Sequence, residues 1–140
     1  MSLPLTLQSS IQITALYAAI MGLFVIYMAK RVTDVRQSMK GPPSDEQKKL
    51  LDVAVRAHGN AIEYIPIALI LLGLAEMNGW TLYWVHGLGA MFVLARFSHA
   101  YGFTKSGGKL SKFRFHGILF SWLSIVALSI LNLISYFHSI

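Results

Sequence analysis

Apolar residues along the chain fall into four blocks, separated by short polar stretches. The blocks cover approximately residues 11–30, 53–77, 80–104 and 114–138. Each block is close to or above the ~20 predominantly apolar residues that an α-helix needs to cross the hydrocarbon layer of a bilayer. The pattern therefore predicts an all-α protein, an integral membrane four-helix bundle that forms a single domain over residues 1–140.

The second helix has a clear sequence signal at its start. Ser44 with Gln47 three residues later is a capping box, and the proline pair at 42–43 stops any earlier helix, so this helix is expected to begin near Asp45. If it continues to about Met77, its ~33 residues at ~1.5 Å each measure roughly 50 Å, well beyond a ~30 Å hydrocarbon layer. Its first turns must therefore stand outside the membrane.

The composition supports the membrane assignment. Charged residues make up 13% of the chain and hydrophobic residues 55%, with a mean hydropathy of +0.56, whereas soluble domains carry ~25% charged residues. Cysteine is absent, which excludes disulfides and a protein thiol nucleophile, so any sulfur chemistry must use a sulfur that a ligand supplies. No pair of histidines has the spacing of metal ligands, and we expect no metal site.

The positions of the basic residues predict the topology. Every Lys and Arg lies within residues 30–56, at Arg96, or within residues 105–114, and Lys30 and Arg31 close the first span. With four spans, the two basic loops share one face, which the positive-inside rule assigns to the cytoplasm, and both termini then lie outside. The net charge of +6 thus indicates topology and not nucleic-acid binding.

The start, MSLPLTLQSS, lacks the pattern of a secretory signal, so we expect the first helix to stay in the mature protein.

Polar residues inside the second and third helices recur at helical spacing. One face of each helix carries them: Asp52, Arg56, Asn60 and Glu63 on the second, and Arg96, His99 and Phe103 on the third. Glu63 and Arg96 lie at matching depth, ~12 Å and ~10 Å from the inner boundary. A charge inside a span costs about 2.5 to 3.5 kcal/mol, so we expect these two side chains to pair. The pair could simply hold the bundle together, but the surplus polar groups at the same depth favour a ligand site.

Small residues within the spans are expected to let neighbouring helices pack closely. The glycines concerned are Gly22, Gly73, Gly87 and Gly89. They indicate a bundle or an oligomer and carry no information on chemistry.

The sequence RAHGNAIEYIP at residues 56–66 resembles a known signature. It matches R-A-x-x-N-x-x-E-Y-x-P in the second helix of the MAPEG superfamily, the membrane-associated proteins in eicosanoid and glutathione metabolism. The rest of the chain agrees in order and spacing, so the resemblance covers nearly all of it and is to a bacterial-type member. It implies a homotrimer in the bacterial inner membrane that binds glutathione between subunits near the cytosolic surface and takes lipophilic small molecules from the surrounding lipids.

The resemblance also implies roles for particular residues. Those expected to bind the cosubstrate glutathione are Arg31 or the adjacent Lys30, Arg56, Asn60, Glu63, Tyr64, Arg96 and His99. Arg114 resembles the catalytic arginine that activates the thiol. Two positions depart from the family pattern: Phe103 replaces a tyrosine whose hydroxyl reaches the ligand, and the loop before Arg114 is longer.

The chemistry of glutathione fits these residue types. Its carboxylates suit the bidentate guanidinium of arginine, and a nearby guanidinium favours the thiolate. The first hypothesis is therefore a glutathione-dependent transferase or peroxidase that acts on lipophilic electrophiles. The alternative is a noncatalytic protein of the same fold that binds glutathione or a lipophilic ligand. A small transporter is a third class, but one acidic residue beside an arginine makes a poor proton-coupled site.

Overall fold

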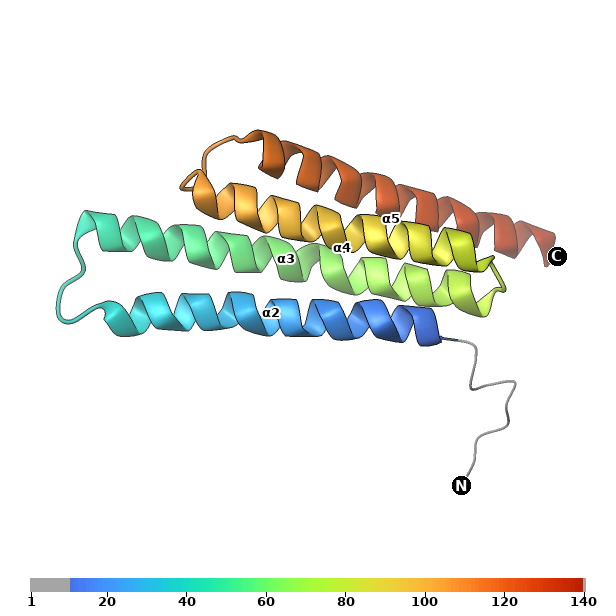
Figure 1. The fold of residues 1–140 in the computed structure, drawn as a ribbon, viewed down its shortest axis with the longest axis horizontal. Helices are drawn as coiled ribbons and strands as arrows, with labels where there is room; N and C mark the ends of the chain where they lie inside the picture. Colours follow the sequence, from blue (N-terminus) through green and yellow to red (C-terminus); the bar gives the residue numbers. More distant parts are fainter. Residues whose placement is uncertain (1–10, 140) are drawn as a thin grey trace, which may run out of the picture.

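The computed structural model describes residues 11–139, which form a bundle of four antiparallel α-helices (Figure 1). These are α2 (Gln12–Ser38), α3 (Asp45–Met77), α4 (Leu82–Lys105) and α5 (Lys112–His138). Short connections join successive helices, and α3 packs against each of the other three. The expectation about the start of the chain falls on residues 1–10, which lie outside the described residues.

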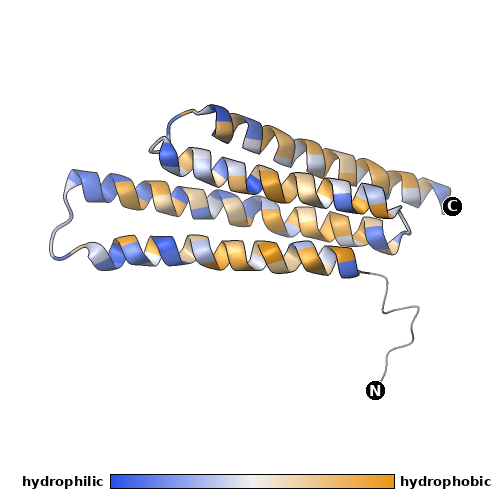
Figure 2. Ribbon diagram, viewed as in Figure 1, coloured by the Kyte–Doolittle hydropathy of each residue, from blue (hydrophilic) through white to orange (hydrophobic). Residues whose placement is uncertain are grey.

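The protein is an integral membrane helical bundle, as the sequence predicts. Three helices, α2, α3 and α5, are long and apolar enough to cross a membrane. In Figure 2 hydrophobic residues cover most of the length of the bundle. Hydrophilic residues gather at the end where one connection joins α2 to α3 and another joins α4 to α5. The helix α4 is not among these three. It carries polar residues such as Arg96 and His99, and both of these side chains are buried inside the bundle. That α4 crosses the membrane as a fourth span remains a prediction.

The start of α3 agrees with the capping signal, whereas α2 ends later than the apolar block predicts. The Ser44 hydroxyl accepts from the backbone N–H of Gln47, the Gln47 side chain accepts from the N–H of Ser44, and α3 begins at Asp45. The helix α2 continues past the basic pair that closes its apolar block and ends only at Ser38. Charges end the membrane-compatible stretch but not the helix, since neither Gly nor Pro interrupts residues 32–38.

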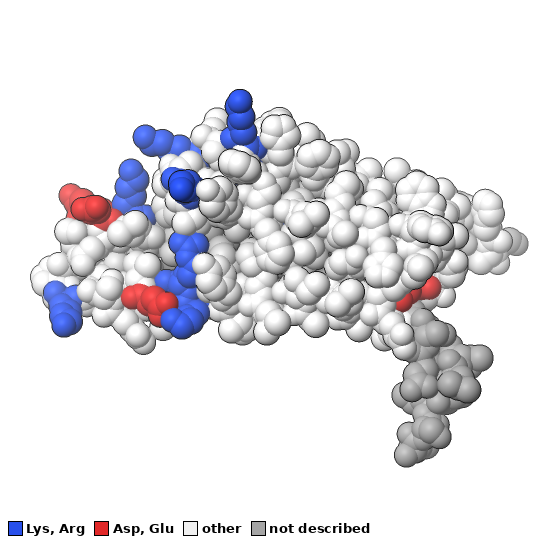
Figure 3. Space-filling view, in the orientation of Figure 1, with Lys and Arg blue, Asp and Glu red and all other residues white. Residues whose placement is uncertain are grey.

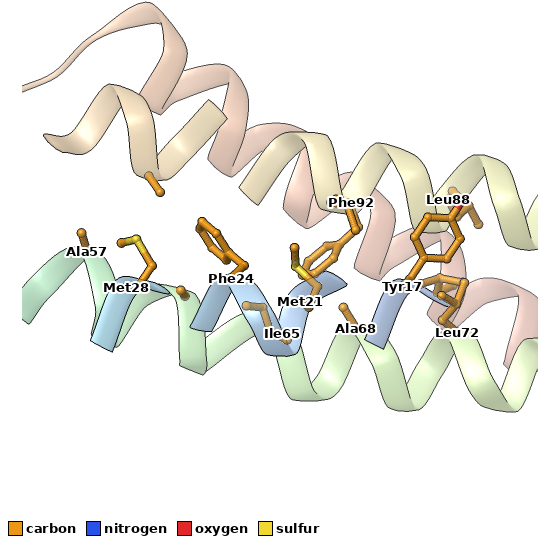
Figure 4. Packing of buried hydrophobic residues seen from close by; sticks show 14 of the residues in the cluster. Tyr17, Met21, Phe24, Met28, Ala57, Ile65, Ala68, Leu72, Leu88 and Phe92 are labelled. Atoms are coloured by element: carbon orange, nitrogen blue, oxygen red, sulfur yellow. The ribbon is translucent and has the colours of Figure 1, made fainter. Parts of the chain in front are cut away.

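The apolar core lies where α2 faces α3 and α4 (Figure 4). Met21, Phe24 and Met28 on α2 extend into the space between these two helices. The opposing face of α3 is lined with alanines such as Ala57 and Ala68, each buried. Small residues on α3 therefore accept the larger side chains of α2, which lets the two helices approach closely.

Two glycines set the close approach of α4 and α5. A Cβ on Gly117 would lie 2.6 Å from the Cα of His99, and one on Gly102 would lie 2.8 Å from the Cβ of Phe113. Of the glycines expected at close contacts, Gly89 does meet a neighbour, the Tyr17 ring at 2.5 Å. Gly22 and Gly87 have open space around them. The tightest helix contact therefore lies between α4 and α5, beside the polar residues of α4.

The two ends of the bundle differ in charge. We call the end that carries the α2–α3 connection (39–44) and the α4–α5 connection (106–111) the loop end. Lys and Arg side chains gather there, and few charges are visible on the rest of the surface in Figure 3. At the opposite end, the Glu76 carboxylate accepts the backbone N–H groups of Ile13 and Thr14 at 2.9 and 2.8 Å and so caps the first turn of α2. The shared position of the two basic loops is as the sequence predicts.

Candidate functional site: a cationic cluster near the loop end

Arg96 is the most completely buried charged residue among residues 11–139, with 0% of its surface exposed. Its Nη2 donates to the Asn60 Oδ1 at 2.6 Å, and its Nη1 donates to the Ser121 hydroxyl at 3.4 Å. The His99 ring nitrogen Nδ1 lies 3.4 Å from the same Nη2, and the guanidinium stands over the Tyr64 ring at 5.5 Å. Four side chains from three helices thus surround one buried guanidinium.

The expected pairing of Glu63 with Arg96 is wrong for the single chain. Glu63 is exposed on the surface of α3, and no ion pair joins it to Arg96 among the described residues. Asn60, one turn earlier, takes the position nearest the guanidinium. Three residues along a helix are ~60° apart around its axis, so the side chain that faces α4 depends on a small rotation of α3. The polar faces of α3 and α4 do meet at one depth, as expected, but the contact is between Arg96 and the neutral side-chain amide of Asn60.

Arg96 is consequently a buried cation whose hydrogen-bond partners are neutral. None of its contacts is a carboxylate, and its Nε has no hydrogen-bond partner among residues 11–139. A buried charge is normally paired, because its transfer from water into an apolar interior is costly. The region around Arg96 therefore favours the approach of an anion.

Two further guanidiniums gather on the Phe103 ring, nearer the loop end. The Arg56 Cζ lies 5.6 Å from the ring centroid and the Arg114 Cζ 4.6 Å, which are cation–π distances. Arg114 also donates through Nη1 to the backbone carbonyls of Gly108 and Lys109, at 2.7 and 3.2 Å. Arg56 has a loose ion pair with Asp52 at 3.6 Å and remains exposed. The ring of Phe103, which carries no hydroxyl, holds the two arginines close together.

The basic residues of α2 lie outside this cluster. Lys30 is exposed and pairs with Asp34 at 2.6 Å. Arg31 turns toward α4 of its own chain, where its Nη1 donates to the Thr104 hydroxyl at 2.9 Å. Within one chain the structure therefore brings together Arg56, Asn60, Tyr64, Arg96, His99 and Arg114. Lys30 and Arg31 lie outside this group, and Glu63 acts on Arg96 only electrostatically, without a direct ion pair.

Ser121 is a contact that the sequence reasoning missed. Its side chain is fully buried, and its hydroxyl donates to the Gly117 carbonyl at 2.7 Å while facing Arg96. The available signal was its spacing, because Ser121 follows Arg114 by seven residues, two helical turns, and so shares its face. Among residues 11–139, no group of three His, Asp or Glu side chains is placed to hold a metal ion.

The fold and this cluster together define a class of protein: an integral membrane helical bundle with a buried cationic site near one surface. Residues 14–134 match the MAPEG family, and the chain belongs to it. The chain is also 33% identical over 121 residues to the inner membrane protein YecN of Escherichia coli strain K12, and equally to YecN of E. coli O6:H1 strain CFT073. Each alignment covers 86% of this chain and 90% of the relative. The predicted family is confirmed.

Proposed function

We propose that this protein is a membrane-bound, glutathione-dependent transferase or peroxidase, in which the glutathione thiolate attacks lipophilic electrophiles. The observation that carries the proposal is the cationic cluster: Arg96 is buried without a direct ion pair among residues 11–139, and Arg56 and Arg114 share one aromatic ring close by. Membership of the MAPEG family supports glutathione as the anion.

The chemistry of the tripeptide assigns roles within the cluster. Arg56 is exposed and can take a glutathione carboxylate with two parallel hydrogen bonds. Arg114 stabilises the thiolate, because a neighbouring guanidinium favours the charged form of a thiol whose reference pKa is near 8.5. Asn60, Tyr64 and His99 hold the buried Arg96 in position beneath the ligand. The electrophile enters sideways from the bilayer and meets the thiolate near the membrane surface.

We further propose that the subunits assemble as homotrimers with the site at their interface. Glu63 supports assembly, because its carboxylate is exposed on a helix that crosses the membrane, where a lipid-facing charge costs about 2.5 to 3.5 kcal/mol. A neighbouring subunit that covers this face removes the charge from lipid. Of the two basic candidates on α2, Lys30 faces outward and can reach a ligand held by a neighbour, whereas Arg31 is engaged with its own α4.

The proposed location is a bacterial inner membrane with the loop end in the cytoplasm. The name of the two E. coli relatives places them in the inner membrane and mentions no reaction. The concentration of Lys and Arg at the loop end supports the orientation through the positive-inside rule. Glutathione, a water-soluble cosubstrate, then reaches the site from the cytoplasm.

A noncatalytic ligand-binding protein is the second candidate, and one observation favours it. Arg114 is already held by two loop carbonyls, and Phe103 offers no hydroxyl to a ligand thiol. If these contacts keep Arg114 in the loop, the site binds glutathione or a lipophilic molecule without activating it. The two candidates share the fold and differ only in what Arg114 does.

Steady-state conjugation of glutathione to 1-chloro-2,4-dinitrobenzene by the purified protein in detergent separates the candidates. We expect Arg114→Ala to lower kcat by tenfold or more with little change in the Kd for glutathione, since thiolate stabilisation acts mainly on the reacting state. Arg56→Ala should instead weaken glutathione binding in calorimetric titration. Lys40→Ala, which removes an exposed charge from the α2–α3 connection, is the matched control.

Two results would contradict the enzymatic proposal, and one would contradict only the role of Arg114. Glutathione binding without turnover favours the noncatalytic candidate. An Arg114→Ala variant that loses affinity but keeps kcat makes Arg114 an anchor and not an activating group. If the intact protein does not bind glutathione, both the proposed reaction and the proposed cosubstrate are wrong.

A further inference from the structure

Phe103 is a core residue that also stands against two cations. Its side chain is 3% exposed, yet the Cζ atoms of Arg56 and Arg114 lie 5.6 and 4.6 Å from its ring centroid. Phe92, on the same helix and in the same apolar core, is equally buried at 2%. No cation stands over the Phe92 ring among residues 11–139. Burial in the core therefore does not by itself explain the two arginines at Phe103.

The two guanidiniums repel each other, and no carboxylate lies between them to offset the repulsion. Arg56 has only the loose ion pair with Asp52 at 3.6 Å, in which both side chains are largely exposed. Arg114 has no ion pair within the part of the chain that the structure describes. The face of an aromatic ring is negative and attracts a cation placed over it. The Phe103 ring is thus the attractive group that both arginines share.

Arg114 is held from a second direction by the connection between α4 and α5. Its Nη1 donates to the carbonyls of Gly108 and Lys109 at 2.7 and 3.2 Å. Gly108 has a φ of +82°, and a Cβ at this position would lie 3.8 Å from the Phe103 ring, so the connection closes over the ring. The Nη2 and Nε of Arg114 make no hydrogen bond to residues 11–139. The ring and the carbonyls therefore orient the guanidinium and leave its other donors to a ligand.

We propose that Phe103 is a positioning residue, whose ring holds Arg56 and Arg114 toward one anionic ligand. The proposal rests on the proposed function for the identity of that ligand, in which Arg56 takes a carboxylate of glutathione and Arg114 its thiolate. Because the ring holds both cations before the ligand arrives, the ligand does not have to bring them together against their repulsion. Phe103 touches neither charged group of the ligand and acts through the charge distribution of its ring.

Fluorination of the ring tests this charge distribution in the full-length protein. Amber suppression replaces Phe103 by mono-, di- and trifluorophenylalanine, in which each fluorine weakens the negative ring face with little change of shape. We expect kcat/KM for the conjugation of glutathione to 1-chloro-2,4-dinitrobenzene to fall with each fluorine. The overall fall should be about tenfold, since two cation–π contacts worth roughly threefold each multiply. The same series at Phe92 is the control and should leave kcat/KM unchanged.

The pH profile separates positioning from a general loss of packing. A guanidinium that is less well oriented stabilises the thiolate less, so the apparent pKa in the profile of kcat/KM should rise along the Phe103 series. A variant that had only lost part of its folded population would show a lower rate with the same apparent pKa.

A second measurement needs neither glutathione nor turnover. In protein labelled with ¹⁵N-arginine, the Nε–H resonances of Arg56 and Arg114 are assigned with Arg56→Lys and Arg114→Lys. Cyclohexylalanine at position 103 keeps a ring of similar shape and removes the aromatic face, so both resonances should shift. The resonance of Arg36, which is exposed on α2, should not.

Three results would overturn the positioning role. They are a kcat/KM that does not depend on fluorination at position 103, an equal fall in the Phe92 series, and resonances of Arg56 and Arg114 that do not shift.

Failure of the proposed reaction gives a different pattern. A wild type that binds glutathione without turnover, and whose Kd for glutathione rises with each fluorine at position 103, supports the positioning role and contradicts the transferase. A wild type that does not bind glutathione lacks the ligand on which the proposal rests, and this result overturns both.

Discussion

The hydrogen bond between Asn60 and Arg96 leads to a quantitative prediction. It is the shortest contact of a guanidinium that is completely buried, at 2.6 Å from Nη2 to Oδ1. Hydrogen bonds to charged groups contribute about 1.5 to 3 kcal/mol, whereas neutral side-chain hydrogen bonds between membrane helices average ~0.6 kcal/mol. We therefore expect Asn60→Ala to lower the free energy of unfolding by about 2 kcal/mol.

Two further variants make the prediction specific to charge. Asn60→Asp keeps an acceptor oxygen beside Arg96 and adds the missing negative charge, so it should lose less stability than Asn60→Ala. Asn132→Ala removes the same type of side chain from neutral partners, the carbonyls of Leu71 and Leu128, and should cost ~1 kcal/mol or less.

Unfolding in mixed micelles, with increasing sodium dodecyl sulfate, measures all three variants through tryptophan fluorescence and far-ultraviolet circular dichroism. Protein concentration must be kept constant, because assembly contributes to the measured stability. The reasoning is refuted if Asn60→Ala costs no more than Asn132→Ala. It is equally refuted if Asn60→Asp is as damaging as Asn60→Ala, since the acceptor beside the guanidinium would then be irrelevant.

Two other predictions concern packing and capping. Gly117→Ala should destabilise the bundle by about 1 to 3 kcal/mol, because the added methyl would lie 2.6 Å from the Cα of His99 and a helix backbone cannot yield easily. Gly87→Ala, with nothing within 4 Å, should be nearly neutral in the same unfolding experiment, and equal losses for the two would contradict the contact. Glu76→Ala should speed hydrogen exchange in the first turn of α2, whose N–H groups donate hydrogen bonds to the carboxylate. It should lower the free energy of unfolding by about 0.5 to 2 kcal/mol. Unchanged exchange at residues 13 and 14 would show that the cap is dispensable.

The sequence predicted most of the fold because the relevant signals are local. Apolar blocks of membrane length and the Ser44–Gln47 capping box each depend on residues close in the chain. The end of α2 was less accessible, since Lys30 and Arg31 close the apolar block while the helix continues to Ser38. Hydropathy indicates which residues can lie in the hydrocarbon layer, but it does not indicate where a helix ends.

The sequence predicted many of the residues that form the candidate site, but only some of the contacts between them. The spacing of polar residues on two helices correctly placed them at one depth, and the family signature named Asn60 and Tyr64, which lie against Arg96. The partner of Arg96 was wrong, because Asn60 and Glu63 are ~60° apart on the helix surface and periodicity does not fix the rotation of α3. Ser121 was missed because a single serine in an apolar helix has many possible environments.

The sequence by itself determined that this chain forms apolar helices, where they are capped, that its basic residues lie at one end of the bundle, and that it belongs to the MAPEG family. Only the tertiary structure decided which groups meet across helices: the amide beside Arg96, the two guanidiniums on Phe103, and the Glu76 carboxylate at the first turn of α2. The reason is physical. Helix formation and membrane insertion depend on neighbours along the chain, whereas contacts between helices depend on their rotation and closeness, which distant residues such as Gly102 and Gly117 control through steric contact.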